Sequence, residues 1–232
     1  MALQAARVGA RKARNRRRRQ GGRGALPEPR WTIRPCEEGD LPALYAIALA
    51  TGANGSDASH LHRDCELIGH IYAAPYLRFA PESSFVVDDG GGVGGYILGA
   101  VDTVAFERLL EARWWPGLRA RYADPSGKPP GEWDADQTRA WQIHHPWRTP
   151  ARIAGPYPSH LHIDLLPRLQ GQGVGRALMD VWLSRVKALG SRGAHLGVGP
   201  ANLRAQRFYR AYGWRELEGE KAGRTMWFVT DL

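Results

Sequence analysis

The stretch that decides the fold runs from Leu165 to Met179 and reads LLPRLQGQGVGRALM. It places a glycine at every second position between a strand-like run and a helix-like run. Glycine is unfavourable in the interior of both elements. The spacing therefore indicates a requirement of the loop itself.

The loop does not match the two best-known phosphate-binding motifs. Counting from Gly171, the sixth place of the dinucleotide fingerprint G-x-G-x-x-G holds Arg176, and no G-K-[ST] follows as in a Walker loop. The spacing instead fits [RQ]-x-x-G-x-[GA], with Gln170, Gly173 and Gly175 in the three defining places.

Glycines in this position leave backbone amides bare and let the phosphates of a ligand approach. The helix that begins at once adds its own unpaired N–H groups and the positive end of its dipole. Arg168 and Arg176 flank the loop and could add positive charge. The pattern predicts an anion site for a pyrophosphate, and the alternative is a tight turn that only needs glycine.

The rest of the chain alternates strand-like and helix-like segments. Asp40 is a candidate N-cap, and Pro42 and Gly52 mark the two ends of the first helix. We expect strands at 31–35, 83–89, 94–102, 160–166, 193–199, 214–218 and 225–230. We expect helices at 41–51, 61–73 (ended by Pro75), 103–122 (broken at Pro116), 135–145, 175–190 and 201–213.

Residues 103–155 differ from their surroundings. Five of the nine tryptophans fall here, around a loop rich in proline and glycine. We interpret this segment as an insertion that packs on the main domain. The tryptophans are either part of a core or an aromatic cap over a pocket.

The basic charge is confined to one end of the chain. Residues 1–24 hold nine Lys or Arg and no acid, and residues 25–232 have no net charge. We expect residues 1–29 to be a disordered arm, with nucleic-acid contact through residues 1–24 and a targeting segment as alternatives. The folded domain should cover residues 30–232.

Few other features narrow the class of protein. No apolar run is long enough to span a membrane, so no membrane partner is expected. Cys36 and Cys65 are far apart, which predicts free thiols in a cytoplasmic protein. The two HLH triplets have no cysteine pairs nearby, and we expect no metal site.

A second motif, NLRAQRFYRAYGW at 202–214, reads N-x-x-A-x-x-F-Y-x-x-x-G-[FW]. Together with the glycine loop, the strand SRGAHLGV and the early segment TIRPCEEGDLPALYAIA, it resembles the GNAT superfamily of N-acetyltransferases. The resemblance implies an α+β fold, with a mixed, mostly antiparallel sheet flanked by helices. The helical insertion would then lie between the third and fourth strands.

Four further segments are similar to the acetyltransferase-like domain at the C-terminal end of animal protein O-GlcNAcases: YILGAVDTVAFE, HIDLLP, SRGA and FYRAYG. In the animal domain the loop glycines are largely replaced, and it is regarded as a pseudo-acetyltransferase. Here Gly171, Gly173 and Gly175 are all present. The resemblance therefore implies binding of acetyl-CoA, with transfer to an unidentified acceptor that is either a small amine or a protein lysine. The alternative is a catalytically silent binding module.

The resemblance also implies residue roles. The amine would attack the thioester directly, with Tyr209 as the acid that protonates the departing thiolate. Asp164 is the first choice for the base, His162 the second, and Asp102 a further candidate acid. These side chains could equally be satisfied polar or packing groups. The implied cofactor contacts are Leu165, Leu166, Arg168, Gln170, Gly171, Gln172, Gly173, Val174, Gly175, Arg176, Asn202 and Phe208.

Overall fold

The computed structural model describes residues 30–217 and 225–232. The predicted arm at 1–29 therefore lies outside the described residues. The strands are β1 (Thr32–Pro35), β2 (Ser84–Asp88), β3 (Val93–Ala100), β4 (Ser159–Leu165), β5 (Gly193–Val198), β6 (Arg215–Glu216) and β7 (Met226–Asp231). The α-helices are α1 (Leu41–Thr51), α2 (Leu67–Tyr72), α3 (Ala74–Phe79), α4 (Thr103–Arg113), α5 (Trp115–Arg121), α6 (Ala135–His144), α7 (Ala151–Ala154), α8 (Val174–Ala188) and α9 (Leu203–Tyr212).

The sheet built by the described residues has seven strands in the order β1-β2-β3-β4-β5-β7-β6. Every neighbouring pair is antiparallel except β4 and β5. These two strands pair in parallel over only two positions, Ser159 with Ala194 and His160 with His195. Beyond His160 they separate, which opens a seam in the middle of the sheet. The predicted α+β class and mixed sheet are confirmed.

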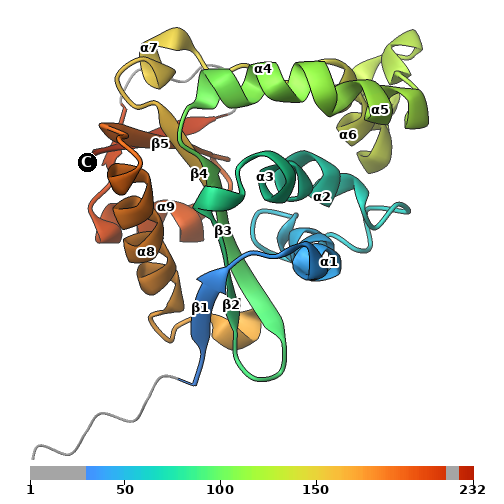
Figure 1. The fold of residues 1–232 in the computed structure, drawn as a ribbon. Coiled ribbons are helices and arrows are strands. Elements are labelled where there is room, and N and C mark those ends of the chain that lie inside the picture. Colours follow the sequence, from blue (N-terminus) through green and yellow to red (C-terminus); the bar gives the residue numbers. More distant parts are fainter. Residues whose placement is uncertain (1–29, 218–224) are drawn as a thin grey trace, which may run out of the picture.

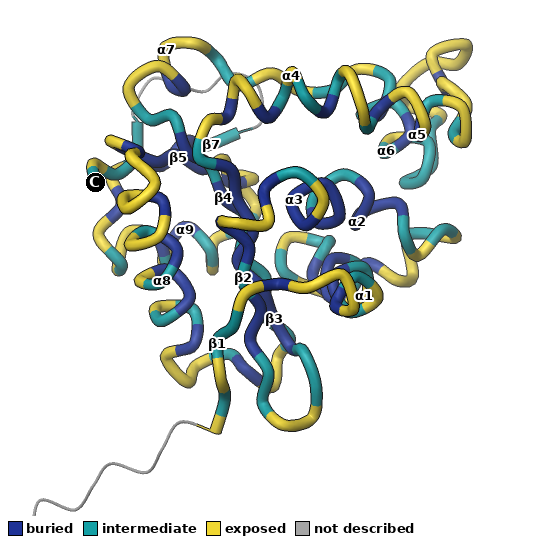
Figure 2. Tube along the Cα trace, in the orientation of Figure 1, coloured by how far each residue is buried: buried dark blue, intermediate teal, exposed yellow. Residues whose placement is uncertain are grey.

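Helices cover both faces of the sheet, and each face has its own core (Figure 1). Helices α1 to α6 pack with Val86, Tyr96 and Leu98 on one face. Helices α8 and α9 pack with Ile97 and Leu161 on the other. Successive strand residues point to opposite faces, so β3 supplies Tyr96 and Leu98 to one core and Ile97 to the other. Figure 2 shows the buried strands between the two helical layers, with exposed turns on α4 and α5.

The first helix begins at Leu41, as the sequence predicts, but Asp40 acts differently from a helix cap. Its carboxylate accepts two hydrogen bonds from Arg34, both at 2.7 Å, and one from the amide of Glu37 at 2.9 Å. No side-chain bond caps α1. The ion pair therefore ties the end of β1 to the start of α1.

The prediction of one helix over 61–73 is wrong. Two short helices, α2 and α3, occupy this region and meet at Ala73, whose backbone leaves the helical conformation. Pro75 lies in the first turn of α3 instead of ending the preceding helix. Proline has no amide proton to continue an existing helix, yet it is well suited to the first turn of a new one.

Residues 103–155 form α4 to α7 between β3 and β4, with 3-10 turns between α5 and α6. Trp115 is buried, and Trp114 donates its Nε1 proton to the carbonyl of His70 at 2.9 Å. Trp133 and Trp141 pack against each other, with ring centroids 5.9 Å apart, whereas Trp147 is 60% exposed. None of the five lines the two cavities described below. Trp114 thus connects the segment to α2, whereas Trp133 and Trp141 pack within the segment.

Candidate active site

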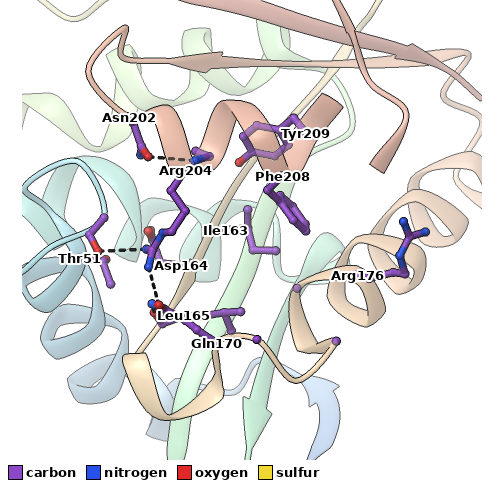
Figure 3. Close-up of a pocket in the computed structure, with 15 residues that line it drawn as sticks. Thr51, Ile163, Asp164, Leu165, Gln170, Arg176, Asn202, Arg204, Phe208 and Tyr209 are labelled. Atoms are coloured by element: carbon purple, nitrogen blue, oxygen red, sulfur yellow. Dashed lines mark hydrogen bonds between the residues drawn. The ribbon is translucent and has the colours of Figure 1, made fainter. Parts of the chain in front are cut away.

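The seam between β4 and β5 contains a cavity of about 410 Å³. Its walls come from four parts of the chain that are distant in sequence. They are the end of α1, strand β4, the glycine loop with the start of α8, and helix α9. The residues that line it are Thr51, Gly55, Ile163, Asp164, Leu165, Gln170, Gly171, Gly173, Gly175, Arg176, Asn202, Arg204, Ala205, Phe208 and Tyr209 (Figure 3).

The glycine loop presents free backbone amides to this cavity. Gly171 and Gly173 have φ angles of +73° and +80°, and a Cβ atom added to either would meet open space. Gly173 occupies the N-cap of the 15-residue helix α8, where no side chain caps the helix. The amides of residues 171–176 donate to no acceptor in the described part of the chain. Unpaired amides at the positive end of a helix dipole form a site for an anion.

Gly175 also leaves space in the cavity because it has no side chain. A Cβ on Gly175 would lie 3.3 Å from the ring of Phe208 and 3.6 Å from Leu165. A side chain there would enter the space between α8 and α9. Leu165 and Gln170 frame the other side, and Gln170 donates to the carbonyl of Leu165 at 2.7 Å.

The three arginines near the loop have different surroundings. Arg168 donates to Asp89 at 2.7 Å and to the carbonyl of Gly92 at 3.2 Å, outside the cavity lining. Arg176 lies at the rim, with its guanidinium 4.9 Å from the ring centre of Tyr212. Arg204, on α9, crosses the cavity mouth to reach the carbonyl of Gly55 at 3.1 Å and the side chain of Gln170. Figure 3 shows these last two bonds as dashed lines.

Asp164 lies at the centre of the site. Burial raises the pKa of its carboxyl to about 6, although the side chain accepts a hydrogen bond from the hydroxyl of Tyr96 at 2.8 Å. The same carboxyl lines the seam cavity and a second, adjoining cavity. Near neutral pH it is ionised, yet it is a much better proton acceptor than an exposed aspartate.

Tyr209 projects from α9 over β4, beside Phe208 (Figure 3). Its side chain is buried, and burial followed by the charge of Asp164 raises the pKa of the phenol well above its usual value. The hydroxyl therefore keeps its proton at neutral pH. A protonated phenol in the seam can donate a proton, which is the role that the resemblance implies for Tyr209.

The second cavity, of about 230 Å³, lies on the α1–α2 side of β4. It shares Thr51, Gly55, Asp164 and Asn202 with the first. His162 opens into it, and desolvation lowers the pKa of this histidine to about 4. The imidazole is therefore neutral at physiological pH. Its ring packs against Tyr72 and Tyr76, and it forms no hydrogen bond with a described residue.

The side chains of His160 and Asp102 form hydrogen bonds within the fold. His160 is hydrogen-bonded through both ring nitrogens, to the hydroxyls of Tyr76 and Thr103, each at 2.8 Å. Asp102 is exposed and caps α4 by accepting from the amide of Ala105 at 2.9 Å. Asp102 lines neither cavity, so the structure separates it from Asp164 and Tyr209.

Most of the other predicted cofactor contacts line the seam. The structure places Leu166, Gln172 and Val174 beside the lining, and Val174 is fully buried in the core. Asn202 caps α9 by accepting from the amide of Ala205 at 3.1 Å. Sequence reasoning missed Thr51, Gly55, Ile163, Arg204 and Ala205. Arg204 could have been found, because it precedes Phe208 by one helical turn and so shares its face.

Among residues 30–217 and 225–232, no group of three or more His, Cys, Asp or Glu side chains is arranged to hold a metal ion. None of the helices in those same ranges has the length and apolar character needed to cross a bilayer.

Sequence comparisons identify related proteins. A family model described as Acetyltransferase (GNAT) family matches residues 131–214. The chain is 28% identical over 192 residues to Protein O-GlcNAcase from Rattus norvegicus and to the same protein from Mus musculus. These alignments cover 81% of this chain and 20% of each relative. The chain thus spans about a fifth of the length of the curated relatives it matches.

Alignments with two solved structures cover most of both chains. The crystal structure of SsHAT is 34% identical, with a TM-score of 0.79, and the alignment covers 88% of this chain and 98% of that one. The yncA structure from Salmonella typhimurium, a putative acetyltransferase with its cofactor acetyl-CoA, shares the fold at 17% identity and a TM-score of 0.50, covering 88% and 95%. The glycine loop, the split sheet and these relatives together show that the chain belongs to the GNAT family of acetyltransferases, which use acetyl-CoA.

Proposed function

We propose that this protein transfers the acetyl group of acetyl-CoA to an amine by direct attack, with both substrates bound at once. The observation that carries the proposal is the position of Asp164, which lines two adjoining cavities. One cavity leads to the free amides of the glycine loop. The other leaves room for an acceptor on the opposite side of the carboxylate.

The residues of the seam fit acetyl-CoA. The amides of residues 171–176 would hold the diphosphate, and the edge of β4 that has lost β5 as a partner would hold the pantetheine arm. Bound there, acetyl-CoA supplies an activated thioester. Arg204 and Arg176 lie at the mouth and rim of the cavity, where positive charge favours a phosphate-bearing ligand.

Two proton transfers complete the reaction. The amine nitrogen forms a bond to the acetyl carbon while the carbon–sulfur bond breaks. Asp164 accepts the proton that the nitrogen loses, since its raised pKa makes it an effective base near neutral pH. Tyr209 donates a proton to the departing sulfur, and the net result is one amide and one thiol. His162, neutral and facing the acceptor cavity, is the alternative base.

The test measures thiol release from acetyl-CoA with a panel of amines, and acetyl-CoA binding by calorimetry. We expect D164N and Y209F each to lower kcat by about 100-fold, the size of a general acid–base contribution, with little change in acetyl-CoA affinity. Y212F is the matched control, because Tyr212 lies on the same helix and bonds to Asp180 outside the cavity. Binding without thiol release above background across the panel would instead show a silent cofactor-binding module.

A further inference from the structure

The acceptor-side cavity differs in character from the cofactor seam. Its lining is mainly polar and includes Asn54, Tyr72, Tyr96, His162 and Asp164. One cation also lines it, Arg139, which comes from α6 in the segment between β3 and β4. The cavity is therefore bounded by a carboxylate on the sheet and by a guanidinium on a helix that packs against α2.

Arg139 is held in place by neutral partners. One of its terminal nitrogens donates to Gln142 Oε1 at 2.9 Å and to the hydroxyl of Tyr72 at 3.3 Å. The guanidinium carbon lies 5.5 Å from the ring centre of Tyr72. The tyrosine hydroxyl in turn donates to Gln142 at 3.3 Å. This arrangement fixes the side chain without neutralising its charge.

No carboxylate in the described part of the chain pairs with Arg139. Asp136, one turn earlier on α6, is already bound to His62 at 2.7 Å and to the amide of Arg63 at 3.0 Å. The other terminal nitrogen and Nε of Arg139 donate to no described residue. A half-buried guanidinium with free donors, fixed at the wall of a polar cavity, matches the planar geometry of a carboxylate.

We infer that the acceptor is a small amine that also carries a carboxylate, with its amine at Asp164 and its carboxylate at Arg139. The inference rests on the proposed acetyl transfer, because it assigns the second substrate of that reaction. A cavity with one negative wall and one positive wall favours an acceptor that carries a positive group at one end and a negative group at the other. A diamine or a basic lysine peptide would place a second cation against Arg139, and like charges repel.

The experiment combines binding and turnover for ligands of matched length. Ligand-observed NMR measures binding of unbranched ω-amino acids from glycine to 6-aminohexanoate, and of the corresponding diamines and monoamines. Thiol release with acetyl-CoA measures kcat/KM for the same compounds and for a lysine peptide amide. We expect at least one amino acid to exceed its matched diamine by about 10-fold or more in both measurements, as a charge-assisted contact predicts.

Variants of Arg139 test the assignment directly. R139Q should remove the preference, lowering binding and kcat/KM for the amino acid by about 10-fold while leaving the monoamine unchanged. R139K, which keeps the charge but loses the planar fork, should fall between them. R108Q removes an exposed arginine of α4 outside this cavity and should behave as the unmodified protein, and circular dichroism checks that all variants fold.

The outcomes separate the two proposals. Thiol release that favours diamines, monoamines or the lysine peptide would overturn the inference and leave the acetyl transfer standing. Amino-acid binding that requires Arg139, without thiol release, would keep the site and refute the transfer reaction. No binding of any amino acid, or an equal loss for all compounds in R139Q, would also overturn the inference.

Discussion

Replacing Asp164 by Asn should make the protein more stable at neutral pH. The substitution keeps the size of the side chain and retains an oxygen that accepts the bond from Tyr96 at 2.8 Å. It removes a negative charge that burial disfavours. The folded state holds the pKa of this carboxyl near 6, above its ordinary value of 3.8, so folding favours the protonated form.

The size of the effect follows from these two pKa values. A raised pKa gives stability that is fully present below pH 3.8 and is lost as the pH rises through about 6. Relative to a side chain that does not ionise, this carboxyl thus lowers the free energy of unfolding by up to about 3 kcal/mol at pH 7.5 and by about 2 kcal/mol at pH 5. D164N does not ionise. Its advantage should therefore shrink by about 1 kcal/mol between these pH values.

Urea denaturation of both proteins at pH 7.5 and pH 5, without acetyl-CoA, measures this difference. D40N is the matched control with the opposite sign, since hydrogen bonding to Arg34 lowers the pKa of Asp40. That variant should be less stable than the unmodified protein by a similar margin at pH 7.5 and pH 5, because its gap closes only below the ordinary pKa of 3.8. A D164N protein that is less stable than the unmodified protein at pH 7.5, or whose gain in stability does not change with pH, would show that burial does not destabilise the carboxylate of Asp164.

Three other predictions concern the cofactor loop, the base and the arm. G173V should weaken acetyl-CoA binding by about 10-fold or more in calorimetry, because its side chain would fill the space above the free amides and because valine disfavours a φ of +80°. G190V is the matched control, because Gly190 has a similar φ of +90° with open space beyond it and follows the other end of α8. Equal losses of affinity in both variants would contradict a phosphate site at Gly173. The specificity constant kcat/KM for an amine acceptor should rise as the pH increases through about 6, because Asp164 ionises there. This increase should disappear in D164N. An unchanged increase in D164N would exclude Asp164 as the base. Deletion of residues 1–24, which carry nine basic side chains, should abolish any salt-sensitive DNA binding measured by fluorescence anisotropy, and equal binding without them would exclude the arm as the contact.

Local sequence was sufficient to locate most of the secondary structure. The glycine loop, the helix that follows it and the α9 motif all lie where their spacing predicts. These elements depend on residues that are close in the sequence. Gly173 and Gly213, for example, adopt the left-handed backbone conformation at helix ends. Two exceptions were 61–73 and 103–122, where Pro75 and Pro116 lie in the first turn of a new helix, a position that suits a residue without an amide proton.

The sequence by itself determined the family of the fold and the position of a candidate anion site, since both depend on glycines and helix ends that act within a few residues. Tertiary structure alone decided how the charged groups are used. It paired Arg168 with Asp89, turned Arg204 across the cavity mouth and brought Arg139 from α6 to a cavity bounded by Asp164. The physical reason is that the pKa of a carboxylate, and the partner of an arginine, depend on burial and on neighbours that the chain brings together only by folding.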